Sequence, residues 1–229
     1  LDLSNFDTSN VTNMGWMFYH CFSLTSLDLS NFNTLQVTDV RRMFYGCASL
    51  TSRDLSTFNT SQVTDMSWMF AGIGRLSSET MKTWDASYVE NWDTSKVTNM
   101  QGMFIMNQNL STLNLNSFDT RNVIDMSYMF YYSPNIKSLN LNKFNTDNVT
   151  DMQLMFHSCH SLTNLELSNW NTKNVMSMKQ MFYSCKNLTN LNLNKWKTEN
   201  VNDMSEMFSW CLNLVELDIS NFNTTNLNY

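Results

Sequence analysis

The stretch "NFDTSNVTNMGWMF" (residues 5–18) returns as "NFNTLQVTDVRRMF" at 31–44 and as "TFNTSQVTDMSWMF" at 57–70, and five further variants follow along the chain. Its aromatic second residue advances by 26 residues each time, except for one step of 34 between Phe58 and Trp92. Self-similarity at a period of about 20–50 residues is typical of solenoids, in which each coil buries its apolar edge only against its neighbours. The sequence therefore predicts a single repeat solenoid over residues 1–229.

The repeat divides the chain into units whose residues we number from 1 (unit position 1, 2 and so on). Eight full units start at 1, 27, 53, 87, 113, 139, 165 and 191, and a partial ninth covers 217–229. The third unit has 34 residues instead of 26, and the insertion of 8 residues lies within 74–87. Because the chain opens in mid-pattern, we expect it to be a segment of a longer array.

Two different apolar spacings occur within one unit. Unit positions 1 and 3, such as Leu27 and Leu29, alternate with polar residues, which predicts a short strand. Unit positions 14, 17, 18 and 21 are apolar at the spacing of one face of a helix. The residue before them is Asn, Asp or Ser, which are good N-cap types. We therefore expect each coil to be a strand, a turn, an extended segment with Val, and a short N-capped helical turn.

Composition excludes several classes of function. The chain is 42% hydrophobic and carries a net charge of −6 with only 14 Lys and Arg. A nucleic-acid partner is not expected, because no basic face could replace the counterions of a phosphate backbone. No apolar run approaches the roughly 18 residues of a membrane span. Catalysis is not expected either, because the acidic residues are spread one or two per coil instead of converging.

Two resemblances follow from these motifs. "LTSLDLSNF" (24–32) resembles the start of a leucine-rich repeat, with the usual Asn replaced by Phe or Trp, so that the ordinary Asn ladder is missing. The longer pattern "LSNFDTSNVTNM…MF…C…L", from Leu3 to Leu24, is similar to bacterial surface proteins with 26-residue repeats, often grouped with BspA-like leucine-rich repeat proteins. This resemblance implies a cell-surface or secreted protein with a role in adhesion or host interaction, and no catalytic residue.

Five cysteines occupy the same unit position, 21, and predict a file of thiols along the stack. The favoured interpretation is a reduced ladder in the core, and the alternatives are one strained disulfide or a metal site. The segment "HSCH", with His157, Cys159 and His160, lacks partner ligands at standard spacing, so no metal or cofactor is expected. The file consists of Cys21, Cys47, Cys159, Cys185 and Cys211.

A file of threonines occupies unit position 8 in all nine units, from Thr8 to Thr224. Because Asp or Asn precedes it in most units, we interpret it as a structural turn residue. Regular Thr files are also what ice-binding solenoids present, which makes ice binding a remote alternative. A second file at unit position 12 is interrupted at Ile124, Met176 and Asn202.

Large side chains that differ from coil to coil gather at unit positions 16, 19 and 20. Trp, Tyr and Arg are the residues that binding surfaces use, but they could instead lie sideways and seal the grooves between coils. We expect a non-enzymatic adhesion module for a protein or glycan; the alternative is a structural spacer or stalk that associates end to end through exposed sheet edges. The candidate binding residues are Trp16, Tyr19, Arg42, Tyr45, Trp68, Tyr128, Tyr131, Tyr132 and Trp210.

Overall fold

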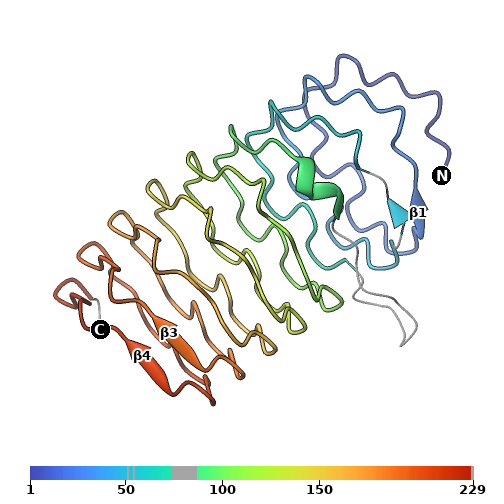
Figure 1. The fold of residues 1–229 in the computed structure, drawn as a ribbon. Coiled ribbons are helices and arrows are strands. Elements are labelled where there is room, and N and C mark those ends of the chain that lie inside the picture. The colour runs from blue at the N-terminus through green and yellow to red at the C-terminus, as the bar shows by residue number, and fades with distance from the viewer. Residues whose placement is uncertain (51, 54, 74–86, 228–229) are drawn as a thin grey trace.

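The chain is a solenoid whose coils stack side by side in one row, with the two termini at opposite ends (Figure 1). The computed structural model describes residues 1–50, 52–53, 55–73 and 87–227. The insertion predicted within 74–87 lies, apart from Ser87, outside these residues. Ser87–Asn91 forms a 3-10 helix, η1, where the described chain resumes.

The strands of the stack are short and parallel. β1 (Ser26–Leu27) pairs with β2 (Ser52–Arg53), and β3 (Asn190–Asn192) pairs with β4 (Glu216–Asp218). Each pair joins residues one unit apart, such as Leu191 and Leu217. These elements lie where the alternation of apolar residues predicts strands. In the remaining described coils the same positions carry no strand.

Most of the pairing between coils occurs on another side of the stack, at unit positions 13–20. The N–H groups at positions 14, 16, 18 and 20 donate to carbonyl groups of the next coil, as from Met14 to Asp39 at 2.9 Å and from Phe18 to Met43 at 3.0 Å. Seven isolated parallel bridges run through position 13. They are Asn13–Asp39, Asp39–Asp65, Asp65–Asn99, Asn99–Asp125, Asp125–Asp151, Asp151–Ser177 and Ser177–Asp203.

The helical turn predicted for this segment is wrong, because the segment is a series of turns. Unit positions 16 and 20 have positive φ in all eight coils, for example 64° at Trp16 and 57° at His20, whereas a helix of L-residues has negative φ throughout. The predicted N-cap residues act as local turn formers: the Asn13 Oδ1 accepts a hydrogen bond from the Gly15 N–H at 2.7 Å. The backbone avoids a helix because its N–H groups find carbonyl partners in the next coil.

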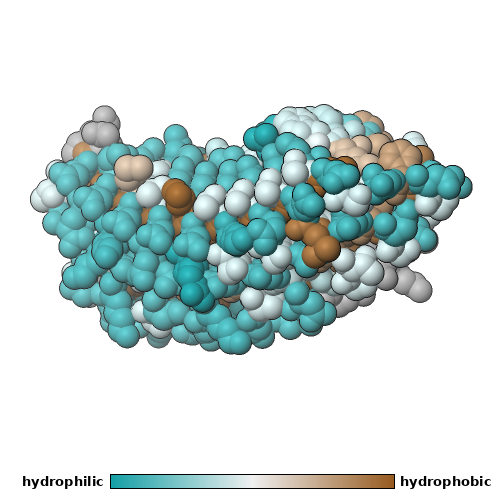
Figure 2. All heavy atoms as spheres, turned by 90° about the horizontal axis from the view of Figure 1, so that it is seen from above, coloured by the Kyte–Doolittle hydropathy of each residue, from teal (hydrophilic) through white to brown (hydrophobic). Residues whose placement is uncertain are grey.

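The core is a set of continuous files of identical side chains. Phe at unit position 18 stacks on Phe of the next coil along the whole row, with ring centroids 5.6–5.9 Å apart. Met43 and Val37 are fully buried, as are their equivalents in most other coils. Hydrophilic residues cover most of the face seen in Figure 2, with a few hydrophobic ones among them. Each coil therefore buries its apolar side against two neighbours, as the repeat predicts.

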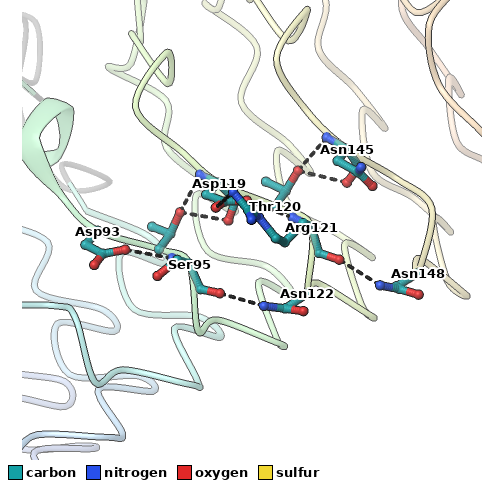
Figure 3. Close-up of polar contacts among 9 residues, drawn as sticks. Asp93, Ser95, Asp119, Thr120, Arg121, Asn122, Asn145 and Asn148 are labelled. Carbon is teal, nitrogen blue, oxygen red and sulfur yellow. Dashed lines mark hydrogen bonds and ion pairs between the residues drawn. The ribbon is translucent and has the colours of Figure 1, made fainter.

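The threonine file joins the coils to one another. The Thr120 hydroxyl donates to the Asn145 carbonyl at 2.8 Å and accepts from the Asn145 N–H at 2.8 Å (Figure 3). Eight threonines of this file, Thr8 to Thr198, are at most 5% exposed. The structural interpretation agrees with this geometry. The ice-binding alternative loses its support, because the threonines on which it mainly rested are buried.

Asparagines form a second set of bonds between coils, at a unit position that differs from the ordinary leucine-rich repeat. The side-chain amides of Asn122 and Asn148 donate to the carbonyls of Ser95 and Arg121 in the preceding coil, both at 2.7 Å (Figure 3). Asn174 and Asn200 repeat this bond further along the stack. The sequence therefore replaces one ladder by another, at unit position 10.

The cysteine file is reduced: none of its five thiols forms a disulfide. The Cys185 Sγ donates to the Phe156 carbonyl at 3.1 Å, and Asn107 and Ser133 place their own donors on the equivalent carbonyls in coils without Cys. Burial raises the pKa of Cys159 to about 12. The file therefore serves as a row of buried donors and not as a row of reactive thiols.

Candidate functional site

The turns at unit positions 14–20 sort their side chains between the core and the surface. Positions 14, 17 and 18 are buried in most coils, whereas positions 16, 19 and 20 carry most of the exposed and half-buried side chains of the turn, along an outer edge that we call the turn edge. The positive φ at positions 16 and 20 turns these side chains away from the core. All nine candidate binding residues from the sequence lie on this edge, because all nine occupy its three positions.

A cation lies between two indole rings at the N-terminal part of the turn edge. The guanidinium carbon of Arg42 is 4.4 Å from the ring centroid of Trp16 and 5.5 Å from that of Trp68. Both distances fall within the roughly 6 Å of a cation–π contact. Arg42 therefore links the first three coils at the surface.

A chain of tyrosines runs beside this contact. The Tyr19 ring packs against Trp16 at 4.7 Å and against Tyr45 at 5.1 Å, and Tyr45 approaches Trp68 at 6.3 Å between centroids. Trp16 and Tyr19 remain 43% and 38% exposed, so these contacts leave part of each ring open to solvent.

Trp68 extends the row past the fourth coil, which has a glycine, Gly102, at unit position 16. Its ring lies over Gly102, where an added Cβ would approach the indole to 3.0 Å, and it meets Tyr128 at 6.0 Å. The Trp68 Nε1–H donates to the Gln101 side-chain oxygen at 2.9 Å. Glycine here makes room for a neighbouring ring, which sequence spacing alone does not reveal.

The row continues into the sixth and seventh coils through residues that the sequence analysis did not select. Tyr128 packs against Tyr131 at 5.8 Å, His157 stacks on Tyr131 at 4.7 Å, and Tyr183 stacks on His157 at 4.6 Å. His157 and Tyr183 share unit position 19 with Tyr19 and Tyr131, so the period itself could have identified them. We call the whole row the aromatic stripe. It consists of Trp16, Tyr19, Arg42, Tyr45, Trp68, Tyr128, Tyr131, His157 and Tyr183.

Two of the nine predicted residues lie beside the stripe or apart from it. Tyr132 is 41% exposed and its ring centroid lies 6.4 Å from that of Tyr131. Trp210 is 62% exposed in the eighth coil, and in the described part of the chain no ring contact joins it to the stripe. The stripe therefore includes seven of the predicted residues, with Tyr132 at its side.

Burial shifts the pKa of two ring side chains in the stripe, His157 and Tyr128. It lowers the pKa of His157, so the imidazole is neutral at pH 7. Burial also raises the pKa of Tyr128, and the carboxylates of Asp151 and Asp125 add to the effect. The guanidinium of Arg42 supplies the positive charge of the stripe.

The residues of the "HSCH" segment do not form a cluster. His157, Cys159 and His160 do not converge, since the Cys159 Sγ donates to the Phe130 carbonyl at 3.2 Å in the core while His157 stacks on tyrosines outside. Over residues 1–50, 52–53, 55–73 and 87–227, no three His, Cys, Asp or Glu side chains gather around a point that could hold a metal ion. None of the helices in these ranges has the length and apolar character needed to span a membrane.

Comparison with known proteins places the chain in a family. The crystal structure of a leucine-rich repeat protein from Bacteroides ovatus ATCC 8483 shares 17% identity with it at a TM-score of 0.42. That similarity covers 89% of this chain and 62% of the other, so the chain spans less than two thirds of that protein's length. No curated protein matches the sequence. The model of the family described as "Mycoplasma protein of unknown function, DUF285" matches residues 1–84, 75–189 and 161–229, and the chain therefore belongs to this family.

Proposed function

We propose that this chain is a non-enzymatic binding module of a bacterial surface or secreted protein, and that the aromatic stripe contacts a protein or glycan ligand. The main observation behind this proposal is that the inward residue of each turn is constant, whereas the outward residue of the same turn varies. Unit position 18 is Phe in every coil, whereas position 16 changes from Trp16 to Arg42, Gly102 and Glu206. A purely structural row would be expected to repeat its surface residues as strictly as its core.

The exposure of the stripe supports binding beyond the sealing of grooves. Its rings pack against one another, yet Trp16 and Tyr19 keep more than a third of their surface in solvent. Trp, Tyr and Arg are enriched among the residues that dominate binding energy, because they bury large areas with few rotatable bonds. The stacking holds each ring in place, which lowers the entropy lost when a ligand covers it. The resemblance to bacterial surface repeats supports the proposed surface location.

A panel of glycans and host-matrix proteins tests this proposal. The test variant replaces Trp16, Trp68 and Tyr128 by Ala, and we expect its affinity for any bound panel member to fall at least about tenfold. The matched control replaces three exposed apolar residues outside the stripe, Leu35, Ile124 and Met176, which are 59%, 48% and 50% exposed, and it should bind like the parent chain.

Thermal unfolding of both variants separates lost contacts from lost structure. Binding that survives in the stripe variant would overturn the assignment of this face. If the parent chain binds no member of the panel, the alternative role as a spacer or stalk is favoured. Light scattering at high concentration would then test whether that spacer associates end to end.

A further inference from the structure

A hollow opens beside the aromatic stripe in the first four coils. Its volume is about 210 Å³, and its floor consists of small residues: Gly46 and Gly72 at unit position 20, Ala71 at position 19, and Ala48. In coils farther along the stack these positions carry larger side chains, for example Tyr131 and Tyr132 in the fifth coil.

The two glycines are not required by the backbone. Gly46 and Gly72 have φ of 70° and 68°, but Met106 and Tyr132 adopt 59° and 52° at the same unit position. A Cβ at Gly46 would approach the His20 Nδ1 to 2.7 Å, so Gly46 makes room for the imidazole, whereas a Cβ at Gly72 would meet only the Gly46 Cα, at 4.0 Å. Glycine at residue 72 therefore leaves open space that the fold could accommodate with a side chain.

The walls of the hollow are mainly apolar. Phe22 and His20 come from the first coil, Tyr45 from the second and Met106 from the fourth. The His20 and Tyr45 rings are 5.2 Å apart at 72° and form one corner. The imidazole and the phenol are the polar side chains in this lining. Such a lining suits an apolar group better than a sugar, which needs several hydrogen-bond partners.

The size of the hollow fits a single side chain. Pockets for complete small-molecule ligands usually enclose about 300–1,000 Å³. At about 210 Å³, this hollow is smaller. Pockets that take one anchoring side chain of a partner protein are the usual energetic centre of a protein interface.

Arg42 places a positive charge near one wall of the hollow, because Trp68, which its guanidinium contacts, also lies 6.3 Å from the ring of the wall residue Tyr45. Its guanidinium carbon lies within cation–π distance of the Trp16 and Trp68 rings, and the guanidinium carries five N–H donors in a planar fork. The ion pairs found among the described residues, Arg41–Asp39 and Arg121–Asp119, do not include it. The Arg42 carbonyl accepts a hydrogen bond from the N–H of Tyr45, a wall residue, at 3.1 Å, so these two residues belong to one turn. A carboxylate is the group whose geometry and charge match such donors.

We propose that the hollow beside Tyr45 takes a large apolar side chain of a protein ligand, and that Arg42 binds a carboxylate of the ligand close to that side chain. This inference rests on the proposed function and makes it specific, because it selects a protein over a glycan. The ligand segment carries Trp, Phe or Leu near Asp, Glu or a C-terminal carboxylate.

Small probes test both halves of the site on the 229-residue chain by NMR titration. N-acetyl-tryptophan supplies the ring and the carboxylate, and N-acetyl-tryptophanamide supplies the ring alone. We expect N-acetyl-tryptophan to bind with a Kd on the order of 1 mM, and the amide to bind about tenfold more weakly. Methyl pyranosides and N-acetylneuraminic acid serve as glycan probes.

Two substitutions taken from other coils distinguish the contributions. Gly72→Met copies Met106, fills the hollow, and should reduce the affinity for N-acetyl-tryptophan at least tenfold. Arg42→Gln copies Gln180 and should abolish the difference between the acid and the amide. Glu206→Gln, in the eighth coil, is the control and should bind both probes like the parent chain.

The outcomes separate this inference from the proposed function. Unchanged binding in Gly72→Met, or glycan probes that bind better than N-acetyl-tryptophan, would overturn the hollow as a side-chain site even if the stripe binds panel members. If the parent chain binds N-acetyl-tryptophan and Gly72→Met abolishes this binding, the hollow is supported as a side-chain site, even if no panel member binds. Melting curves of all variants exclude unfolding as the cause.

Discussion

The core file and the turn edge lie two residues apart in the same turn, and they follow opposite rules. Phe130 stacks on identical rings in both neighbouring coils, at 5.9 and 5.7 Å. Tyr128 meets Trp68 from two coils away and Tyr131 from its own coil. The difference teaches that the inward side chains and the bonds between coils define the backbone. The outward side chains are therefore free to vary, and function can be built from them.

The largest expected effect tests the core side of this comparison. Phe130→Ala removes a fully buried ring from the middle of the stack and should lower the free energy of unfolding by about 3–5 kcal/mol, measured by chemical denaturation. The control is Tyr128→Ala in the same turn, which should cost less than about 1 kcal/mol. Equal losses in the two variants would remove the distinction between core and edge.

Next in size is the loss of one bond pair between coils. Thr120→Val keeps the shape of the side chain but removes the hydroxyl from two half-buried bonds with the Asn145 N–H and carbonyl, so we expect a loss of about 1–3 kcal/mol. Thr120→Ser retains the hydroxyl and should recover most of that loss. If Val and Ser destabilise equally, the methyl group and not the hydroxyl joins the coils.

A smaller effect distinguishes the turns from the helix that the sequence suggested. Glu206 is exposed with φ of 54°, a conformation in which Gly is preferred over Ala by about 1 kcal/mol. Glu206→Gly should therefore be more stable than Glu206→Ala in thermal unfolding. In a helix the order would be reversed, with Ala favoured by about 1 kcal/mol, so the sign alone decides between the two backbones.

The smallest effect concerns the carboxylates at unit position 13, next to the turn edge. Burial, with the nearby charges of Asp151 and Asp65, raises the pKa of Asp125 above 3.8. The folded state therefore binds this proton more tightly than the unfolded state, and the stability it contributes below pH 3.8 is lost as the pH rises through the folded pKa. Asp125→Asn should gain a few tenths of a kcal/mol over the parent chain at pH 7 but not at pH 3.

Asn already occupies unit position 13 in other coils, as at Asn13 and Asn99, which makes the substitution conservative. Asn13 donates from its side-chain amide to Asp39 at 3.2 Å and also accepts from the Gly15 N–H. Unfolding curves at the two pH values give the difference directly. A variant that is less stable at pH 7 would mean that the bonds from Gln101 and Ser127 to Asp125 outweigh the repulsion.

The sequence repeat by itself predicted much of the structure of this protein. A residue that recurs in every coil must meet its own copies, because each coil packs against the next, so the burial of Phe and Met at unit positions 17 and 18 follows from the period. The Asp or Asn before Thr in most units indicated the structural role of the Thr file, and a reduced Cys file was the favoured one of three interpretations. The variable positions 16, 19 and 20 identified most of the aromatic stripe, whose part in binding stays a proposal.

The tertiary structure alone decided how the backbone bonds and how the edge side chains meet. Apolar residues at the spacing of positions 14, 17, 18 and 21 fit a helix or a series of turns equally well; the carbonyl groups of the neighbouring coil, absent from any single unit, select the turns. For the same reason spacing could not show that Trp68 crosses Gly102 to reach Tyr128. Local sequence determines which residues face the core, but contacts between coils determine the conformation that brings them there.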